Sequence, residues 1–147
     1  MICSETISEV SSALVKARSE FTAVSKDSEN PYFNSKYSDI NSILGMIDPI
    51  LSKHGLSIIQ PSIPSGDGVC IQTVLLHESG EYLASEGMLV PAAKNDPQGY
   101  GAAVTYTCRY ALQSFFGLRS EDDDGNAAVQ AMSKVEQARA RAAQRSS

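Results

Sequence analysis

The chain has 147 residues, 42% of them hydrophobic and 20% charged, with a formal net charge of −5. A chain of this length fits one domain with a single core, and its composition excludes the disordered and fibrous classes. The negative charge argues against a broad nucleic-acid-binding surface, which is usually basic. It does not exclude a few cations in one groove, which assembly of the chain would repeat.

The cysteines and the first residues indicate the compartment. Cys3, Cys70 and Cys108 are widely separated and form no Cys-x-x-Cys pair, so neither a disulfide framework nor a zinc site is expected. Glu5 stands where a signal peptide would be basic, and no apolar stretch approaches the ~20 residues of a membrane span. We expect a cytoplasmic protein without a membrane partner.

A first amphipathic helix is predicted from Ser4, its N-cap, to about Lys26. Its apolar residues recur at three- and four-residue steps: Ile7, Val10, Leu14, Ala17 and Phe21. Pro31 disfavours helical backbone at the residue before it, so a turn is expected at Asp27–Pro31. The loop predicted after this turn carries ring and cationic side chains: Tyr32, Phe33, Lys36 and Tyr37.

A second helix is predicted after a cap at Ser38 or Asp39, and it ends at Lys53–Gly55. It presents one apolar stripe: Ile40, Ile43, Leu44, Ile47, Ile50 and Leu51. Pro49 interrupts this stripe, which predicts either a kink or two short helices, the second of them capped by Asp48.

Three strand-like runs follow and predict an antiparallel meander. They are Leu56–Ile63, Val69–His77 and Glu81–Val90, separated by turn residues at Gly66–Gly68 and Glu78–Gly80. The second run is apolar on both faces in part, so one face of the sheet needs a helix over it.

A third helix is predicted over Gly99–Leu118, after a loop at Pro91–Gln98. One side of it is apolar and suited to cover the sheet: Val104, Cys108, Ala111, Leu112, Phe115 and Leu118. The order of helices and strands predicts an α+β fold, with N-terminal helices and a three-stranded antiparallel meander covered by a C-terminal helix.

The end of the chain differs in composition. An acidic break at Glu121–Asn126 leads into Ala127–Ser147, which is rich in Ala, Gln and Arg and has too few large apolar residues to pack firmly. We therefore predict a domain over residues 1–120 and a flexible or frayed helical tail over residues 121–147.

The other side of the third helix combines rings with a cation. Tyr106, Arg109 and Tyr110 lie there between the positions of Ala102 and Gln113. Aromatic platforms beside positive charge hold single-stranded nucleic acid, with Lys36, Tyr37 and Lys94 as candidates in nearby loops. Tyrosines on a helix are also common as half-buried packing residues, and this alternative stays open.

The sequence carries little that indicates catalysis. The run Glu121–Asp124 offers oxygen ligands for a divalent cation, but four adjacent acids cannot converge on one ion. His54 and His77 lie in different predicted elements without a paired nucleophile, and no Gly-x-x-x-x-Gly-Lys-Ser/Thr motif occurs. We expect no enzymatic activity, no metal and no cofactor.

Three segments of unusual composition then indicate a family. They are Asn30–Ile40, Leu51–Leu56 and Asp96–Gly125. In their order and spacing, over about residues 4–126, the chain resembles the Erf (essential recombination function) family of phage single-strand annealing proteins. In similar sequences two basic residues precede the second tyrosine of the third helix, whereas here Cys108 precedes Arg109.

The resemblance implies a protein that coats single-stranded DNA, assembles into homo-oligomeric rings or filaments and anneals complementary strands without ATP. It also implies a βββα-type core, a partner exonuclease, a host single-strand-binding protein and a place in the bacterial cytoplasm. The candidate DNA-binding residues are Lys36, Tyr37, Lys94, Gln98, Tyr106, Arg109 and Tyr110. Two alternatives stay open: an oligomeric scaffold without affinity for DNA, and a magnesium-dependent nuclease.

Overall fold

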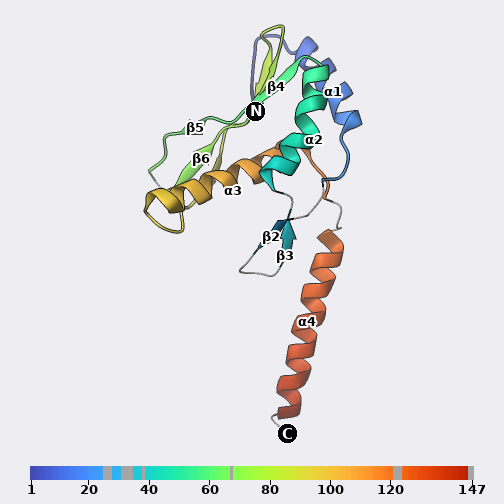
Figure 1. The fold of residues 1–147 in the computed structure, drawn as a ribbon, viewed down its shortest axis with the longest axis vertical. Helices are drawn as coiled ribbons and strands as arrows, with labels where there is room; N and C mark the ends of the chain where they lie inside the picture. The colour runs from blue at the N-terminus through green and yellow to red at the C-terminus, as the bar shows by residue number, and fades with distance from the viewer. Residues whose placement is uncertain (25–27, 31–34, 38, 67, 121–123, 146–147) are drawn as a thin grey trace.

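The computed structural model describes residues 1–24, 28–30, 35–37, 39–66, 68–120 and 124–145. Helices α1 (Ser8–Glu20), α2 (Ile40–Lys53) and α3 (Pro97–Phe116) pack with antiparallel strands, whereas α4 (Asp124–Arg145) extends away from them (Figure 1). The predicted α+β class is confirmed.

Helix α1 begins later than the sequence predicts because a distant residue caps it. The backbone N–H of Val10 donates to the Glu81 carboxylate at 2.8 Å, and the Thr6 hydroxyl donates to the same carboxylate at 2.7 Å. These contacts hold the pKa of Glu81 below its usual range. Ser4, the predicted N-cap, instead donates to the carbonyl of Thr6 at 2.6 Å, directly after the short strand β1 (Ile2–Cys3).

Helix α1 also ends earlier than predicted, at Glu20 rather than near Lys26. The reason is that the chain after it runs beside the segment after α3. The N–H of Val24 donates to the carbonyl of Arg119 at 2.8 Å, and Val24 forms a parallel bridge with Ser120. Val24 is buried there, so continued helix would lose both the bridge and the packing.

The loop predicted around Lys36 is in part a β-hairpin. Strands β2 (Ser28–Asn30) and β3 (Ser35–Tyr37) pair antiparallel, with Glu29 opposite Lys36. Pairing satisfies backbone groups that a loop would leave to water, and the short segments carry little local signal for it. The predicted positions Tyr32 and Phe33 lie outside the described residues.

Helix α2 is continuous through Pro49, so the alternative of two short helices is wrong, and the alternative of a kink stays a prediction. Its N-cap is Asp39, as predicted, whose carboxylate accepts the N–H of Ser42 at 2.7 Å. Three fully buried residues on both sides of Pro49 anchor the helix: Ile43, Ile47 and Leu51. This shared packing holds the two halves in one helix despite the missing N–H of the proline.

Each of the three predicted strands is interrupted near its middle. The six resulting strands are β4 (Leu56–Ile59), β5 (Ser62–Ile63), β6 (Val69–Ile71), β7 (Val74–His77), β8 (Tyr82–Ala84) and β9 (Met88–Val90). Together with β1 they form two sheets, one of order β1-β8-β7-β4 and one of order β5-β6-β9. Every strand pair in these two sheets is antiparallel.

Polar side chains bridge the interruptions between the two sheets. Pro61 follows β4 and has no N–H to donate, while its carbonyl accepts the N–H of Gln72 at 3.1 Å. The Ser85 hydroxyl accepts the N–H of Thr73 at 2.9 Å, and the Gln60 amide donates to the Thr73 hydroxyl at 3.1 Å. These contacts replace the ladder bonds that a continuous strand would make.

The core has two parts, which share α3. The larger part lies between α1, α2, the C-terminal half of α3 and the sheet of β7, with Leu75 and Leu112 fully buried in it. The smaller part lies under the N-terminal half of α3 and contains Val69, Ile71 and Ala103. Helix α3 packs on the β5-β6-β9 sheet, whereas α1 and α2 pack on the sheet that contains β4 and β7, and α3 contributes residues to both parts of the core.

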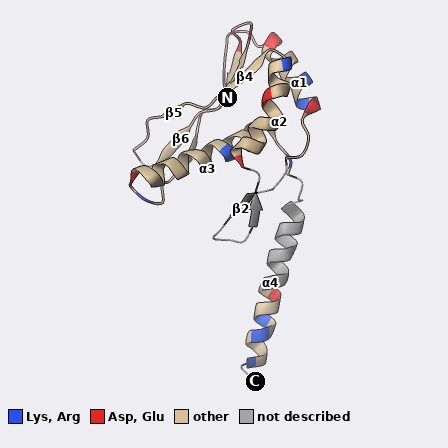
Figure 2. Cartoon of the chain, viewed as in Figure 1, with Lys and Arg blue, Asp and Glu red and all other residues tan. Residues whose placement is uncertain are grey.

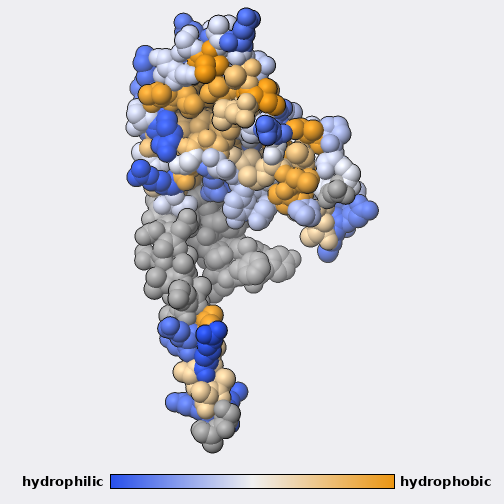
Figure 3. Space-filling view, turned by 180° about the vertical axis from the view of Figure 1, so that it is seen from behind, coloured by the Kyte–Doolittle hydropathy of each residue, from blue (hydrophilic) through white to orange (hydrophobic). Residues whose placement is uncertain are grey.

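The face of the sheets that no helix covers carries exposed apolar side chains. Ile59 pairs with Val74, Val74 with Ala84 and Ala84 with Ile2, so these four residues form one row across the sheet. The core residue Leu75 belongs to the opposite face, because side chains alternate along a strand. Figure 3 shows apolar patches on the side of the molecule turned away from the viewer in Figure 1.

Helix α4 occupies most of the segment predicted as a tail. All its described side chains, from Val135 to Arg145, are exposed. Among the charged residues of this end of α4, basic residues outnumber acidic ones (Figure 2). The segment is helical over Asp124–Arg145, and a flexible or frayed tail stays a prediction.

Candidate nucleic-acid interface

The local sequence specifies both ends of α3. Asp96 caps the N-terminus, where its carboxylate accepts the N–H of Gly99 at 2.6 Å, and Pro97 takes the first position. Gly117, with φ of 61°, adopts the left-handed conformation that ends the helix. The helix thus begins within the loop predicted at residues 91–98.

The most buried residues of α3 lie slightly to one side of the apolar stripe that the sequence predicts. Ala103 and Thr107 are buried, whereas Val104 and Cys108 are half-buried and pack against the smaller core cluster. The Thr107 hydroxyl donates to the carbonyl of Ala103 at 2.6 Å, which satisfies a polar group in the core. Burial raises the pKa of the Cys108 thiol, so this residue lies on the packed side, as its helical position predicts.

Two tyrosines form a platform on the opposite side of α3. Tyr106 and Tyr110 lie one turn apart and are 49% and 41% exposed. Their ring centroids are 4.5 Å apart, with an angle of 45° between the planes. The exposed fractions leave ring surface accessible to a ligand, and the alternative of half-buried packing residues stays open.

A guanidinium group lies over this platform. The Arg109 guanidinium carbon is 4.8 Å from the ring centroid of Tyr110 and 5.6 Å from that of Tyr106. Both distances fall within the range of a cation–π contact, worth about 0.5–1 kcal/mol at exposed sites. This contact holds the Arg109 guanidinium on the same side of α3 as the rings of Tyr106 and Tyr110.

The charge of the platform is positive at neutral pH. The neighbouring Tyr110 raises the pKa of Tyr106, burial adds to the effect, and Arg109 opposes it. The Tyr106 hydroxyl is protonated at neutral pH already at its ordinary pKa of 10.0, and the upward shift does not change this. Tyr106 therefore presents a neutral ring that does not repel phosphate.

A groove with a volume of about 620 Å³ lies between the N-terminal half of α3 and the segment after β9. Its walls are mostly apolar, with Val90, Pro91 and Ala93 on one side and Ala102 and Ala103 on the helix. Its polar lining consists of Lys94, Asp96, Gln98 and the hydroxyl-bearing ring of Tyr106. The groove therefore opens onto the tyrosine platform.

The structure brings together five of the seven predicted DNA-binding residues. Lys94, Gln98 and Tyr106 line the groove, and Arg109 and Tyr110 continue the same face by one turn. The other two, Lys36 and Tyr37, are on β3, and their side chains lie outside the described residues.

The family of the chain follows from a comparison with protein-family models. The model of the ERF superfamily matches residues 10–147. The chain belongs to the ERF superfamily. This family is associated with phage recombination and strand annealing, and membership confirms the resemblance. No curated protein and no solved structure matches the chain.

Sequence reasoning missed the groove walls of this ERF protein. Val90, Pro91 and Ala93 come from the end of a strand and from a loop, and nothing in their local pattern places them opposite α3. One available signal was the Asp96–Pro97 pair, which is typical of a helix start. It would have placed the predicted start of α3 at Pro97 instead of Gly99. The position of the other groove wall depends on the tertiary structure and could not be predicted from the local sequence.

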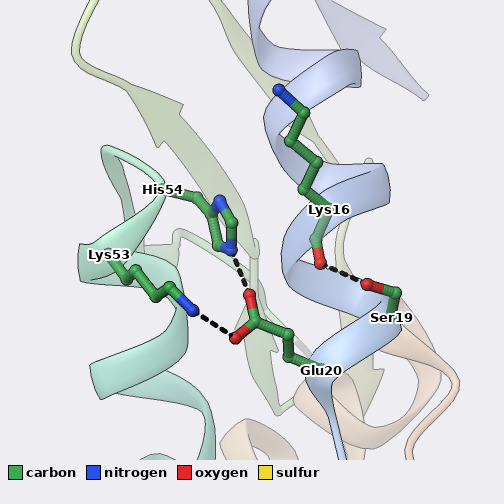
Figure 4. A network of polar contacts seen from close by, with 5 residues as sticks. All are labelled: Lys16, Ser19, Glu20, Lys53 and His54. Atoms are coloured by element: carbon green, nitrogen blue, oxygen red, sulfur yellow. Dashed lines mark hydrogen bonds and ion pairs between the residues drawn. The ribbon is translucent and has the colours of Figure 1, made fainter.

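The histidines of the ERF chain take structural positions. The imidazole Nε2 of His54 contacts the Glu20 carboxylate, and the Lys53 ammonium donates to the same carboxylate at 2.7 Å (Figure 4). This network joins the ends of α1 and α2 and lowers the pKa of Glu20. His77 bonds through Nδ1 to the Ser79 hydroxyl at 2.8 Å in the turn before β8.

A second cavity, of about 310 Å³, lies where α1 and α3 end. Its lining includes Arg18 and Arg119. The Arg18 guanidinium donates to the carbonyls of Phe116 at 2.6 Å and of Gly117 at 3.0 Å. Arg18 therefore supplies partners to the C-terminal end of α3, a structural role.

Possible metal ligands are dispersed over the described part of the chain. Within the described ranges, no group of three or more His, Cys, Asp or Glu residues could hold a metal ion. Glu121–Asp123 of the acidic run lie outside those ranges, and Asp124 begins α4. Of the helices in the described part of the chain, none has the length and apolar character needed to cross a membrane.

Proposed function

We propose that this ERF protein binds single-stranded DNA through the exposed face of α3 and anneals complementary strands without ATP. The observation that carries the proposal is the platform of Tyr106 and Tyr110 under the Arg109 guanidinium, beside an open groove. Exposed rings stack on bases of any sequence, and a cation beside them neutralises phosphate. Family membership supports the same function.

Annealing requires no catalytic group. The protein must neutralise part of the backbone, keep the strand extended and release it to a complementary strand. Base pairing then supplies the driving force, at about 1.4 kcal/mol per stacked step of duplex. A surface of two rings and one guanidinium is suited to such loose binding, and we propose that the protein is not an enzyme.

The negative net charge is compatible with this function if the protein assembles. One subunit offers few cations, but a homo-oligomeric ring or filament repeats the site along one strand and multiplies weak contacts. Exposed apolar residues on the helix-free sheet face support such assembly, since Ile59 is 47% and Leu89 54% exposed. We propose that this face takes part in contacts between subunits.

We propose a division of the chain into an annealing domain over residues 1–120 and a flexible tail over residues 121–147. The buried residues of the larger core lie between Val10 and Phe116, which supports a domain that is complete before the tail. Within it, we propose that the three interrupted strands and α3 form a βββα-type core. The partners proposed are an exonuclease and a host single-strand-binding protein in the bacterial cytoplasm.

The experiment that tests this function measures annealing of two complementary labelled oligonucleotides with purified protein. It is run in chelator and without ATP, beside single-strand binding at two salt concentrations. Faster annealing together with salt-sensitive binding is the expected result. Strand cleavage that disappears in chelator would instead indicate the magnesium-dependent nuclease.

One alternative has an observation in its favour. The exposed apolar residues of the sheets, Ile2, Ile59 and Leu89, also fit an oligomeric scaffold that does not bind DNA. Such a scaffold would assemble in the annealing experiment but would neither bind the oligonucleotides nor accelerate their pairing. The same experiment therefore separates the two functions.

A further inference from the structure

The groove beside α3 has the size and lining of a small-molecule site. Its volume of about 620 Å³ falls within the range of roughly 300–1,000 Å³ typical of ligand pockets. The small side chains of Ala93 and Ala102 leave the groove open between its two walls. The ring of Tyr106 lines the end of the groove that meets the tyrosine platform. A flat, mostly apolar ligand with a polar edge fits this shape.

The polar groups of the groove define the ligand further. The Asp96 carboxylate already accepts the N–H of Gly99 at 2.6 Å, so it serves the helix start. Lys94 supplies an ammonium group and Gln98 an amide, and both side chains are exposed. An amide has donors and an acceptor for the edge of a heterocycle, and an ammonium binds phosphate.

We infer that the groove admits one unstacked nucleobase of the single strand, placed against the ring of Tyr106, with the adjoining phosphate at Lys94. The inference rests on the proposed function and extends it. The platform of Tyr106 and Tyr110 is continuous with the groove, so a strand that stacks on the platform passes the groove opening. The chemical class of the ligand is a nucleotide within a chain.

This arrangement explains a preference for single strands. A base inside a duplex must unpair and leave the stack before it can enter a pocket, whereas a base of a single strand is already free to turn outward. Phosphate contacts alone do not distinguish single-stranded from duplex DNA in this way. Capture of a base therefore makes the site selective for the form that an annealing protein must bind.

The test compares an oligothymidine with an abasic oligonucleotide of the same length, which keeps the phosphates and lacks the bases. The wild-type protein should bind the oligothymidine more tightly, by roughly 5- to 150-fold for each base that stacks on the protein. The double variant Ala93→Leu/Ala102→Leu narrows the groove from both walls, so it should lose roughly one such factor and keep the preference that stacking on the platform rings supplies. Thr105→Leu, at an exposed position of α3 outside the groove lining, is the control and should behave as wild type.

The outcomes separate the inference from the proposed function. If the double variant has an unchanged melting temperature and keeps the full wild-type preference for the oligothymidine, the groove is overturned as the base site, and the proposed function still stands. A double variant that changes only in assembly size also overturns the groove as the base site, since the groove would then hold a second copy of the chain. If the wild-type protein binds and anneals DNA but does not distinguish the oligonucleotides, neither the groove nor the platform holds a base. If it binds neither oligonucleotide, the proposed function fails.

Discussion

Replacing Arg109 with alanine tests whether the cation over the tyrosine platform contacts phosphate. The guanidinium carbon lies 4.8 Å and 5.6 Å from the two ring centroids, so a strand stacked on the rings passes within reach of it. Removing one phosphate contact to a single strand flattens the slope of log K against log salt by about 0.7. Between about 50 and 200 mM salt, this change reduces the salt effect on affinity about 2.6-fold per site.

The assay is fluorescence anisotropy of labelled oligonucleotides over a salt series. Arg109→Ala should weaken binding to every sequence by a similar factor, because a phosphate contact carries no sequence information. Lys16→Ala is the control, since Lys16 is an exposed cation on α1. An unchanged affinity and slope for Arg109→Ala, or an equal loss for both variants, would refute the assignment of Arg109 to the site.

Other variants test the rings, the core, an ion pair and the sheet face. Tyr106→Ala and Tyr110→Ala should each weaken single-strand binding by ~1–3 kcal/mol at an unchanged melting temperature, whereas a lower melting temperature with intact binding would mark them as packing residues. Leu112→Ala, at a fully buried position, should lower the free energy of unfolding by about 2–5 kcal/mol in urea denaturation. Because the pKa of Glu20 is lowered in the folded protein, its ionised carboxylate stabilises the fold at pH values above the ordinary pKa of 4.5. The difference in melting temperature between wild type and Glu20→Gln should therefore shrink as the pH falls below 4.5. Leu89→Ser should reduce the assembly size measured by light scattering, and an unchanged size would exclude this face as a subunit contact.

The sequence alone was informative where the cause of a structure is local. The apolar spacing of α2 and α3 predicted both helices, because side chains three and four residues apart share one face. Asp39 was predicted as a cap and takes that position. The placement of Tyr106, Arg109 and Tyr110 on one side of α3 also follows from helical geometry alone.

The sequence could not predict features that arise from contacts between distant segments. Helix α1 starts where Glu81 reaches it across 71 residues of chain, and Ser4 has the local features of a cap without taking that role. Pro49 predicts a break in α2, but packing on both sides of it outweighs the missing hydrogen bond. In each case burial or a long-range hydrogen bond stabilises an arrangement that local preference alone would not select.

The candidate site shows the same division. Residue type and helical spacing determine the aromatic and cationic face of α3, so the sequence by itself indicates the chemistry of the ligand. Only the tertiary structure creates the groove, because its walls come from the segment after β9 and from α3, which the packing of Val69 and Ile71 under Ala103 brings together. A pocket is a property of surfaces that meet, and their meeting depends on the core beneath them.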